Sequence, residues 1–233
     1  MSSAKPTSSV PAKKSRICFF GGEKGGIGKT TLAILFAYLF WEAKREICGI
    51  TLDYSNPAFK RQLTGILPSS SVGAFSLIRS KDISKLGSFL SENSSKIILI
   101  DSPSSFYYLF ESSLLDFLLV SDRLDFFWIV SEESNSFKQL FAYQQSLADH
   151  PNINYWVFFP DWIHGGEFDS NFEGLPCYRF PTISPFILSK LKEDLQFLKF
   201  KELGDPYLKG IIESYLLRFK NQLGEKLNPF LMG

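Results

Sequence analysis

A glycine-rich segment near the start of the chain combines the residue types that bind a polyphosphate. Glycines let backbone N–H groups curl around phosphates, and a helix that begins directly after them adds its positive end. A lysine in this setting reaches the β and γ oxygens of a nucleotide, and the hydroxyl that follows can bind Mg²⁺. The segment therefore predicts a phosphate-binding loop, formed by Gly25, Gly26, Ile27, Gly28, Lys29, Thr30 and Thr31.

Two aspartates each follow an apolar run further along the chain. Asp53 comes directly after residues 47–52, and Asp101 comes directly after residues 96–100. In open α/β sheets, ligands bind beyond the carboxyl ends of the strands, so both carboxylates should meet Thr30 there. Two carboxylates and a hydroxyl would then converge at one edge of the sheet. Asp53 could also cap a helix that begins near Pro57, and the two roles are compatible.

The elements that position these residues can be read from apolar periodicity. Short apolar runs predict buried parallel strands at residues 17–20, 47–52, 96–100, 126–130 and 155–159. Longer segments predict helices at residues 30–43, 113–120, 136–147, 185–200 and 207–227, and a surface loop at 165–176. This alternation predicts an α/β fold, a doubly wound and mostly parallel sheet with helices on both faces.

Composition bounds the class of protein. The chain has 233 residues, of which 45% are hydrophobic and 21% charged, and this suits one globular domain over residues 16–233 after a disordered basic and Ser-rich tail over 1–15. The net charge of +1 means that only a local patch could bind nucleic acid or membrane. The three cysteines lack C-x-x-C spacing and the two histidines lack ligand spacing, so we expect a reducing, cytoplasmic location and no Cys- or His-built metal site.

The segment from Lys24 to Thr31 resembles the deviant Walker A motif of the ParA/MinD family of ATPases. The strict pattern G-x-x-x-x-G-K-[ST] fails, because Glu23 stands where its first glycine belongs, but Lys24 completes the family's form of the loop. The resemblance implies a P-loop NTPase fold, ATP and Mg²⁺ as ligands, and a homodimer that sandwiches two nucleotides. It implies catalytic roles for Lys29 and for Lys24, which would contact the ATP of the partner subunit.

The resemblance extends to the aspartates. Family members usually carry an Asp-x-Asp-Pro-type segment whose second aspartate positions the attacking water. Aligned without gaps from Lys24, Thr51 replaces the first aspartate and Asp53 falls on the second, so we interpret Asp53 as the catalytic carboxylate. A shift of two residues would instead put Ser55 there and would predict slow or absent turnover. Residues 97–103 resemble a Walker B segment with Asp101 at its end, and the resemblance implies that Thr30, Asp53 and Asp101 hold Mg²⁺. Residues 178–181 resemble the short strand and turn near the adenine.

The family resemblance implies a short ParA-type ATPase with slow intrinsic turnover. Such a protein would bind DNA nonspecifically as an ATP dimer, drive plasmid or DNA partition, and hydrolyse ATP on contact with a ParB-like or other activating partner. The basic residues available for DNA are Lys190, Lys192, Lys199, Lys201, Lys209, Arg218, Lys220 and Lys226.

Other functions share the same chemistry. A MinD-like membrane-associated ATPase could use residues 211–227 as an amphipathic helix, although their apolar spacing favours packing on the chain's own sheet. An accessory ATPase for conjugation or plasmid stability remains open. A weakly hydrolysing, nucleotide-dependent scaffold also remains open, because Thr51 departs from the family pattern.

Overall fold

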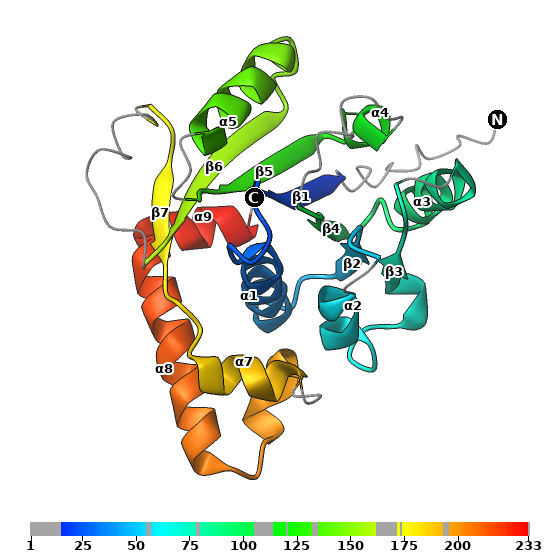
Figure 1. Ribbon diagram of the computed structural model, residues 1–233. Coiled ribbons are helices and arrows are strands. Elements are labelled where there is room, and N and C mark those ends of the chain that lie inside the picture. The colour runs from blue at the N-terminus through cyan, green and yellow to red at the C-terminus, as the bar shows by residue number, and fades with distance from the viewer. Residues whose placement is uncertain are drawn as a thin grey trace, which may run out of the picture.

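Seven parallel strands form one sheet at the centre of the molecule, in the order β3-β2-β4-β1-β5-β6-β7 (Figure 1). The computed structural model describes residues 15–54, 57–77, 80–104, 114–119, 121–131, 135–161, 172, 174–192 and 196–232. The strands are β1 (Arg16–Gly21), β2 (Ile47–Thr51), β3 (Val72–Ala74), β4 (Ile97–Asp101), β5 (Arg123–Ile129), β6 (Ile153–Pro160) and β7 (Cys177–Phe180). The predicted doubly wound parallel sheet is confirmed, whereas residues 1–14 of the predicted tail lie outside the described residues.

Helices cover both faces of the sheet. One face carries α1 (Lys29–Glu42), α2 (Ala58–Leu63), α7 (Pro185–Lys192), α8 (Pro206–Leu223) and α9 (Leu227–Met232). The other carries α3 (Ser80–Glu92), α4 (Leu114–Leu119) and α5 (Asn135–Ser146). Short 3₁₀ turns complete the chain at η1 (Ser69–Ser71), η4 (Phe197–Glu202) and η5 (Gly224–Lys226). No helix in the described segments is long and apolar enough to span a bilayer.

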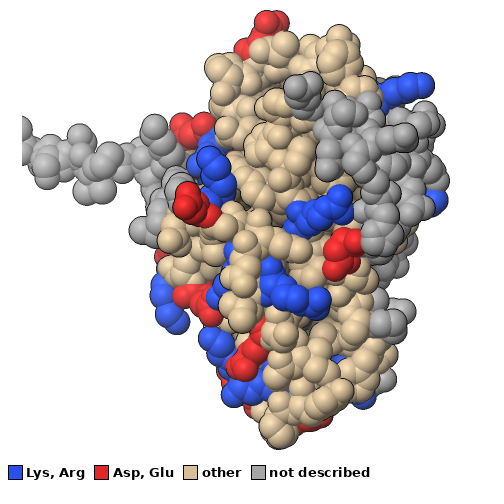
Figure 2. All heavy atoms as spheres, turned by 90° about the vertical axis from the view of Figure 1, so that its left-hand side faces the viewer, with Lys and Arg blue, Asp and Glu red and all other residues tan. Residues whose placement is uncertain are grey.

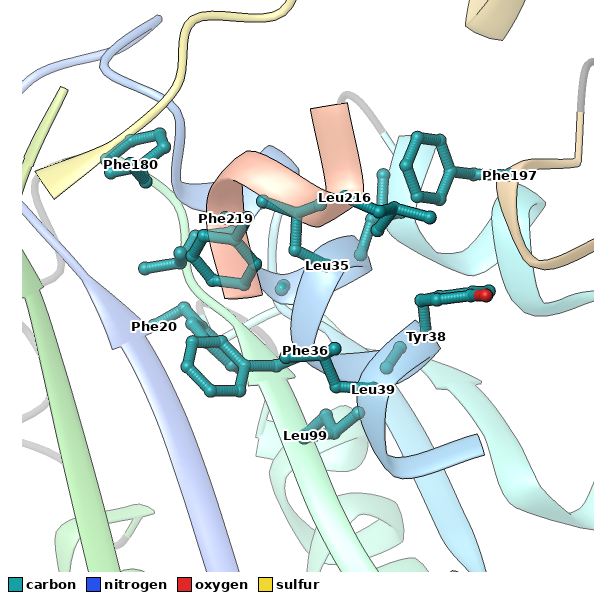
Figure 3. Close-up of a cluster of buried hydrophobic side chains, with 14 of the residues drawn as sticks. Phe20, Leu35, Phe36, Tyr38, Leu39, Leu99, Phe180, Phe197, Leu216 and Phe219 are labelled. Carbon is teal, nitrogen blue, oxygen red and sulfur yellow. The ribbon is translucent and has the colours of Figure 1, made fainter. Parts of the chain in front are cut away.

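The helix α1 is the centre of the larger core. It is apolar around most of its circumference, which is typical of a helix buried on all sides. Phe36 packs against Phe20 of the sheet on one side and Phe219 of α8 on the other, with ring centroids 5.7 and 5.6 Å away (Figure 3). The predicted packing of residues 211–227 on the sheet is confirmed, because their apolar side chains Ile212, Tyr215, Leu216, Phe219 and Leu223 are buried.

The order of the strands places the candidate site. The central strand β1 lies between β4 and β5, and β2 lies on the far side of β4. Phe20 of β1 and Thr51 of β2 both pair in register with Asp101 of β4. The helix that follows β1 is α1 and the helix that follows β4 is α4, and these two lie on opposite faces of the sheet. Folds of this kind bind ligands at the carboxyl ends of such strands.

A buried network of charged residues lies toward the amino ends of the central strands, opposite the candidate site. Arg16, at the start of β1, donates from Nε to Asp125 Oδ2 over 2.7 Å and from Nη1 to the carbonyl oxygen of Phe230 over 2.6 Å. Asp125 also accepts from Arg123 and from the indole nitrogen of Trp156. The network joins β1, β5 and β6 to the last helix, α9.

Some elements differ from the sequence prediction. The strand β3 and the helix α3 were not predicted. The helix predicted over 185–200 ends at Lys192, and a 3₁₀ turn begins at Phe197. The helix predicted over 207–227 ends at Leu223, because Gly224 takes φ +54° and breaks the helical repeat. After the turn η5, the helix α9 begins at Leu227, the predicted end, and continues to Met232.

Candidate functional site

The glycine-rich segment forms a loop between β1 and α1, as predicted. Gly28 takes φ +106°, a left-handed conformation that favours glycine, and a Cβ on it would lie 2.9 Å from Cζ of Phe180. Gly22 lies so close to β5 that a Cβ would approach the carbonyl oxygen of Ile129 to 2.7 Å. As the N-cap of α1, Gly28 has no side chain to accept from the first N–H groups of the helix. These donors are suited to an anion.

Lys29 occupies the first position of α1 and is 6% exposed. Its Nζ donates to the carbonyl oxygen of Lys24 over 2.7 Å, so the ammonium lies beneath the loop. Burial lowers the pKa of Lys29 to about 8, although the negative charges of Asp101 and Asp53 act to raise it. A buried ammonium held by a loop carbonyl can exchange that oxygen for those of a phosphate.

Thr30 and Asp101 form a contact between α1 and β4. The hydroxyl of Thr30 donates to the Asp101 carboxylate, with Oγ1 2.9 Å from Oδ2 and 3.2 Å from Oδ1. Asp101 is completely buried, and burial raises its pKa to about 7, while the Thr30 hydrogen bond and the charge of Lys29 act in the opposite direction. A hydroxyl beside a carboxylate at a phosphate site is a donor set that suits Mg²⁺. These two residues fit the predicted ion.

A cavity of about 370 Å³ opens beside the loop. Its lining includes most of the predicted binding residues, namely Gly25, Gly26, Gly28, Lys29, Thr30, Thr31 and Asp53. Asp101 lies behind Thr30 and does not line the cavity. Lys24 is exposed outside it, and the side chain of Ile27 is buried in the core. The structure therefore brings the loop, Asp53 and Asp101 together. Ser55, the alternative to Asp53, lies outside the described residues.

The sequence analysis missed several residues that also line this cavity: Ile34, Ala58, Arg61, Gln62, Ser102 and Ser104. Ser102 directly follows Asp101 and could have been found from that position. Its hydroxyl donates to the carbonyl oxygen of Phe20 over 2.7 Å. Arg61 and Gln62 come from α2, and nothing in the local sequence marks them.

Thr51 was noted in the sequence only as a departure from the family pattern. It is completely buried and lies in register with Asp101, so both side chains project toward the α1 face of the sheet. Its hydroxyl has no hydrogen-bond partner among the described residues. An unpaired buried hydroxyl is costly, and this one lies on the strand next to Asp101 without lining the cavity itself.

The sheet, the loop and the helix that follows it define the α/β fold of P-loop NTPases. Among solved structures, the chain is similar to a ParA family ATPase from Chlorobium tepidum, with a TM-score of 0.57 and 16% identity over 88% of this chain and 98% of that chain. It is also similar to the MinC:MinD cell division protein complex of Aquifex aeolicus, with a TM-score of 0.56 and 14% identity over 88% of this chain and 97% of that chain.

A third similar structure is cobyrinic acid a,c-diamide synthase from Mycobacterium smegmatis, solved with an ATP analogue and magnesium, with a TM-score of 0.50 and 15% identity over 82% of this chain and 97% of that chain. Comparisons with protein-family models and with curated proteins found no match. The chain has the fold of the ParA and MinD ATPases, as its loop predicted.

Proposed function

We propose that the protein is a ParA/MinD-type ATPase that binds ATP and Mg²⁺ and dimerises around them. The observation that carries this proposal is the convergence of three groups at one end of α1. The buried ammonium of Lys29, the hydroxyl of Thr30 and the carboxylate of Asp101 lie directly beneath a glycine loop. The fold shared with ParA and MinD ATPases supports the same activity.

Each residue then has a distinct task. Lys29 neutralises β- and γ-phosphate oxygens, together with the N–H groups of the loop. Thr30 and Asp101 hold Mg²⁺, which supplies charge neutralisation to the phosphates when bound. Asp53 lines the cavity, and its carboxylate orients the attacking water. Intrinsic turnover is slow until the site is completed.

Lys24 completes the site from the partner subunit. Its position supports this role, because Lys24 is exposed to solvent and belongs to the loop whose carbonyl oxygen accepts from Lys29. We infer a homodimer in which each Lys24 offsets the charge that develops on the partner's nucleotide. A ParB-like or other activating protein then stimulates hydrolysis. In the similar MinC:MinD complex, a protein of this fold binds a partner protein, which supports the proposal.

For the cargo, we propose nonspecific DNA and a role in plasmid or DNA partition in the cytoplasm. Two of the basic residues expected to contact DNA are engaged within the fold. Lys201 and Lys220 both form ion pairs with Glu42, so they serve the fold. On the face of the molecule around α8 and β7, Lys and Arg are interspersed with Asp and Glu (Figure 2). Arg218 and Lys226 are exposed and remain as candidates, doubled across the dimer.

The MinD-like membrane function is less favoured. The helix expected to enter a membrane packs its apolar side chains into the core, as Tyr215 and Phe219 show. Of its large hydrophobic residues, Tyr207 and Leu217 are exposed, and these do not form a continuous apolar face.

The first experiment measures ATP binding by calorimetry with Mg²⁺, followed by release of phosphate. We expect Lys29→Ala to abolish productive binding and Lys85→Ala, a change of an exposed lysine on α3, to leave it unchanged. Lys24→Ala should bind ATP but remain monomeric in size-exclusion chromatography with light scattering. Equal ATP binding by Lys29→Ala and the wild type would refute the assignment of the site.

The second experiment measures duplex DNA binding with ATP, with ADP and without nucleotide, at low and high salt, beside a liposome control. ATP-dependent and salt-sensitive DNA binding supports the partition function. Liposome binding without DNA binding would replace it with the membrane function. Binding of neither would favour the nucleotide-dependent scaffold.

A further inference from the structure

A second cavity, of about 540 Å³, adjoins the candidate nucleotide site, and we propose that it binds a nucleoside monophosphate. Its described residues come from the chain after β2, from α2 and its end, from the end of β3 and from Gln196, which directly precedes η4. They are Tyr54, Pro57, Lys60, Arg61, Thr64, Ala74 and Gln196. Arg61 lines both cavities, so the two sites are neighbours at the carboxyl edge of the sheet. This proposal goes beyond the ATPase function and does not depend on it.

The charge of this cavity favours an anion. Lys60 and Arg61 are exposed and occupy consecutive positions of α2, and neither forms a salt bridge within the described residues. No aspartate or glutamate is among the described residues that line the cavity. By contrast, Lys201 and Lys220 on the same side of the sheet are both paired with Glu42. A lysine and an arginine that face a cavity whose described lining holds no carboxylate can bind a phosphate group.

The walls also suit a planar ring. Tyr54 is 57% exposed, a large fraction for an aromatic side chain, and it lines the cavity immediately after Asp53. An exposed tyrosine offers a stacking surface to a base. The volume falls within the usual range for small-molecule sites. A phosphate on Lys60 and Arg61 with a base on Tyr54 is the arrangement of a nucleoside monophosphate.

The far wall is held in place by hydrogen bonds. Gln196 Nε2 donates to the carbonyl oxygen of Thr64 over 2.6 Å, and the backbone N–H of Phe197 donates to Gln62 Oε1 over 2.8 Å. Lys199 Nζ donates to the carbonyl oxygen of Gly65 over 3.3 Å. These bonds hold Gln196 and η4 against α2 and the turn that follows it. The cavity is therefore preformed, which limits the ordering cost of binding.

The test separates the two cavities by filling the first. The full chain is saturated with ADP and Mg²⁺, and AMP is then titrated by calorimetry while retained ADP is quantified. We expect one AMP to bind for each chain without loss of ADP. Lys60→Ala should weaken AMP binding at least about tenfold, because it removes a charge-assisted hydrogen bond. Tyr54→Ala should weaken it about tenfold, and Tyr54→Phe should retain it.

The controls keep the result specific. Lys85→Ala should bind AMP as the wild type does, and Lys60→Ala should still bind ADP. Adenosine and inorganic phosphate should each bind more weakly than AMP, since adenosine keeps only the contact with Tyr54 and phosphate keeps only those with Lys60 and Arg61. Failure of AMP to bind the ADP-filled protein at millimolar concentration overturns the proposal. So does unchanged affinity in both Lys60→Ala and Tyr54→Ala, or binding of an acidic peptide here in place of AMP. Loss of ADP binding in the wild type would instead refute the ATPase proposal.

Discussion

Gly28 of the phosphate loop packs close to Phe180 at the end of the edge strand β7. Its φ of +106° and the 2.9 Å approach of Phe180 to a Cβ in this position leave no room for a side chain. We expect Gly28→Ala to lower ATP binding at least about tenfold and to lower the melting temperature, because strain and overpacking together cost roughly 1–3 kcal/mol or more. Calorimetry and thermal unfolding measure the two effects.

A matched control for this variant is Gly174→Ala. Gly174 also has a positive φ, of +86°, but among the described residues a Cβ there meets no atom within 4 Å. It should lose some stability and keep ATP binding. If both variants lost ATP binding equally, the contact of Gly28 with Phe180 would have no role at the site.

The buried carboxyl group of Asp101 should make the stability of the ligand-free protein depend on pH. Burial raises its pKa from 3.8 to about 7, so the ligand-free fold favours the protonated carboxyl. This contribution to stability is fully present below about pH 4 and is lost as the pH rises through about 7. Asp101→Asn removes the titration. The ligand-free variant should therefore melt at least about 2 °C above the wild type at pH 8.

The same variant should lose the stabilisation that ATP and Mg²⁺ give to the wild type, because an amide is a poor substitute for the carboxylate. Thermal unfolding at pH 5 and pH 8, with and without ATP and Mg²⁺, measures both effects. A variant that is less stable than the wild type at pH 8 would contradict the prediction.

The individual residues of the loop could be predicted because phosphate binding requires fixed residue types at fixed spacing. Lys29, Thr30 and Asp101 meet as expected. Arg61 and Gln62 could not be predicted in the same way, since they reach the site only through the packing of α2 on the sheet. Long-range packing of this kind leaves no local pattern.

Among the elements, α1, η4 and α8 are tied together at Glu42. Its carboxylate accepts from Lys220 over 2.5 Å, from Lys201 over 3.2 Å and from the hydroxyl of Tyr38 over 2.8 Å. Burial alone would raise the pKa of Glu42, but these hydrogen bonds outweigh it and hold the pKa at about 2. Because this value lies below the ordinary 4.5, the stabilisation is present above about pH 4.5 and is lost as the pH falls toward 2.

We expect Glu42→Ala to lower the melting temperature at pH 7 by a few degrees, because it leaves Lys201 and Lys220 without their counter-ion. The loss should become smaller as the pH is lowered below 4.5. Glu92→Ala, a change of an exposed carboxylate on α3, serves as the control and should have little effect. Equal melting temperatures for Glu42→Ala and the wild type at pH 7 would show that the contacts at Glu42 add nothing to stability.

The elements were predictable where an apolar run was long enough to be recognised. The central strands β1, β2, β4, β5 and β6 follow their predicted ranges closely. The strand β3 is only three residues, Val72–Ala74, and is too short to give a period. The break at Gly224 was missed because glycine inside a helical pattern is often tolerated, and only its positive φ identifies the turn.

At the scale of the whole molecule, stability depends on a contact between the two ends of the described chain. The ring of Phe230 in α9 lies 4.2 Å from the guanidinium carbon of Arg16 and packs against Phe36 and Trp156. Phe230→Ala should lower the melting temperature by about 6 °C or more, because deleting a buried phenyl ring costs about 3–5 kcal/mol. Phe141→Ala, at a ring that is 50% exposed, should change it little. Thermal unfolding of both variants measures the difference, and equal losses would contradict it.

The hydrogen bond from Arg16 to Phe230 spans 214 residues of chain, and this has a consequence for synthesis in the cell. The strand β1 is the middle of the sheet and emerges from the ribosome 214 residues before Phe230, so one donor of its arginine has no partner until Phe230 has left the exit tunnel. Until then the nascent chain exposes the apolar surface that α9 covers. The sheet is therefore completed only after Phe230 has emerged, and a translational pause before residue 230 would prolong the period in which chaperones are needed.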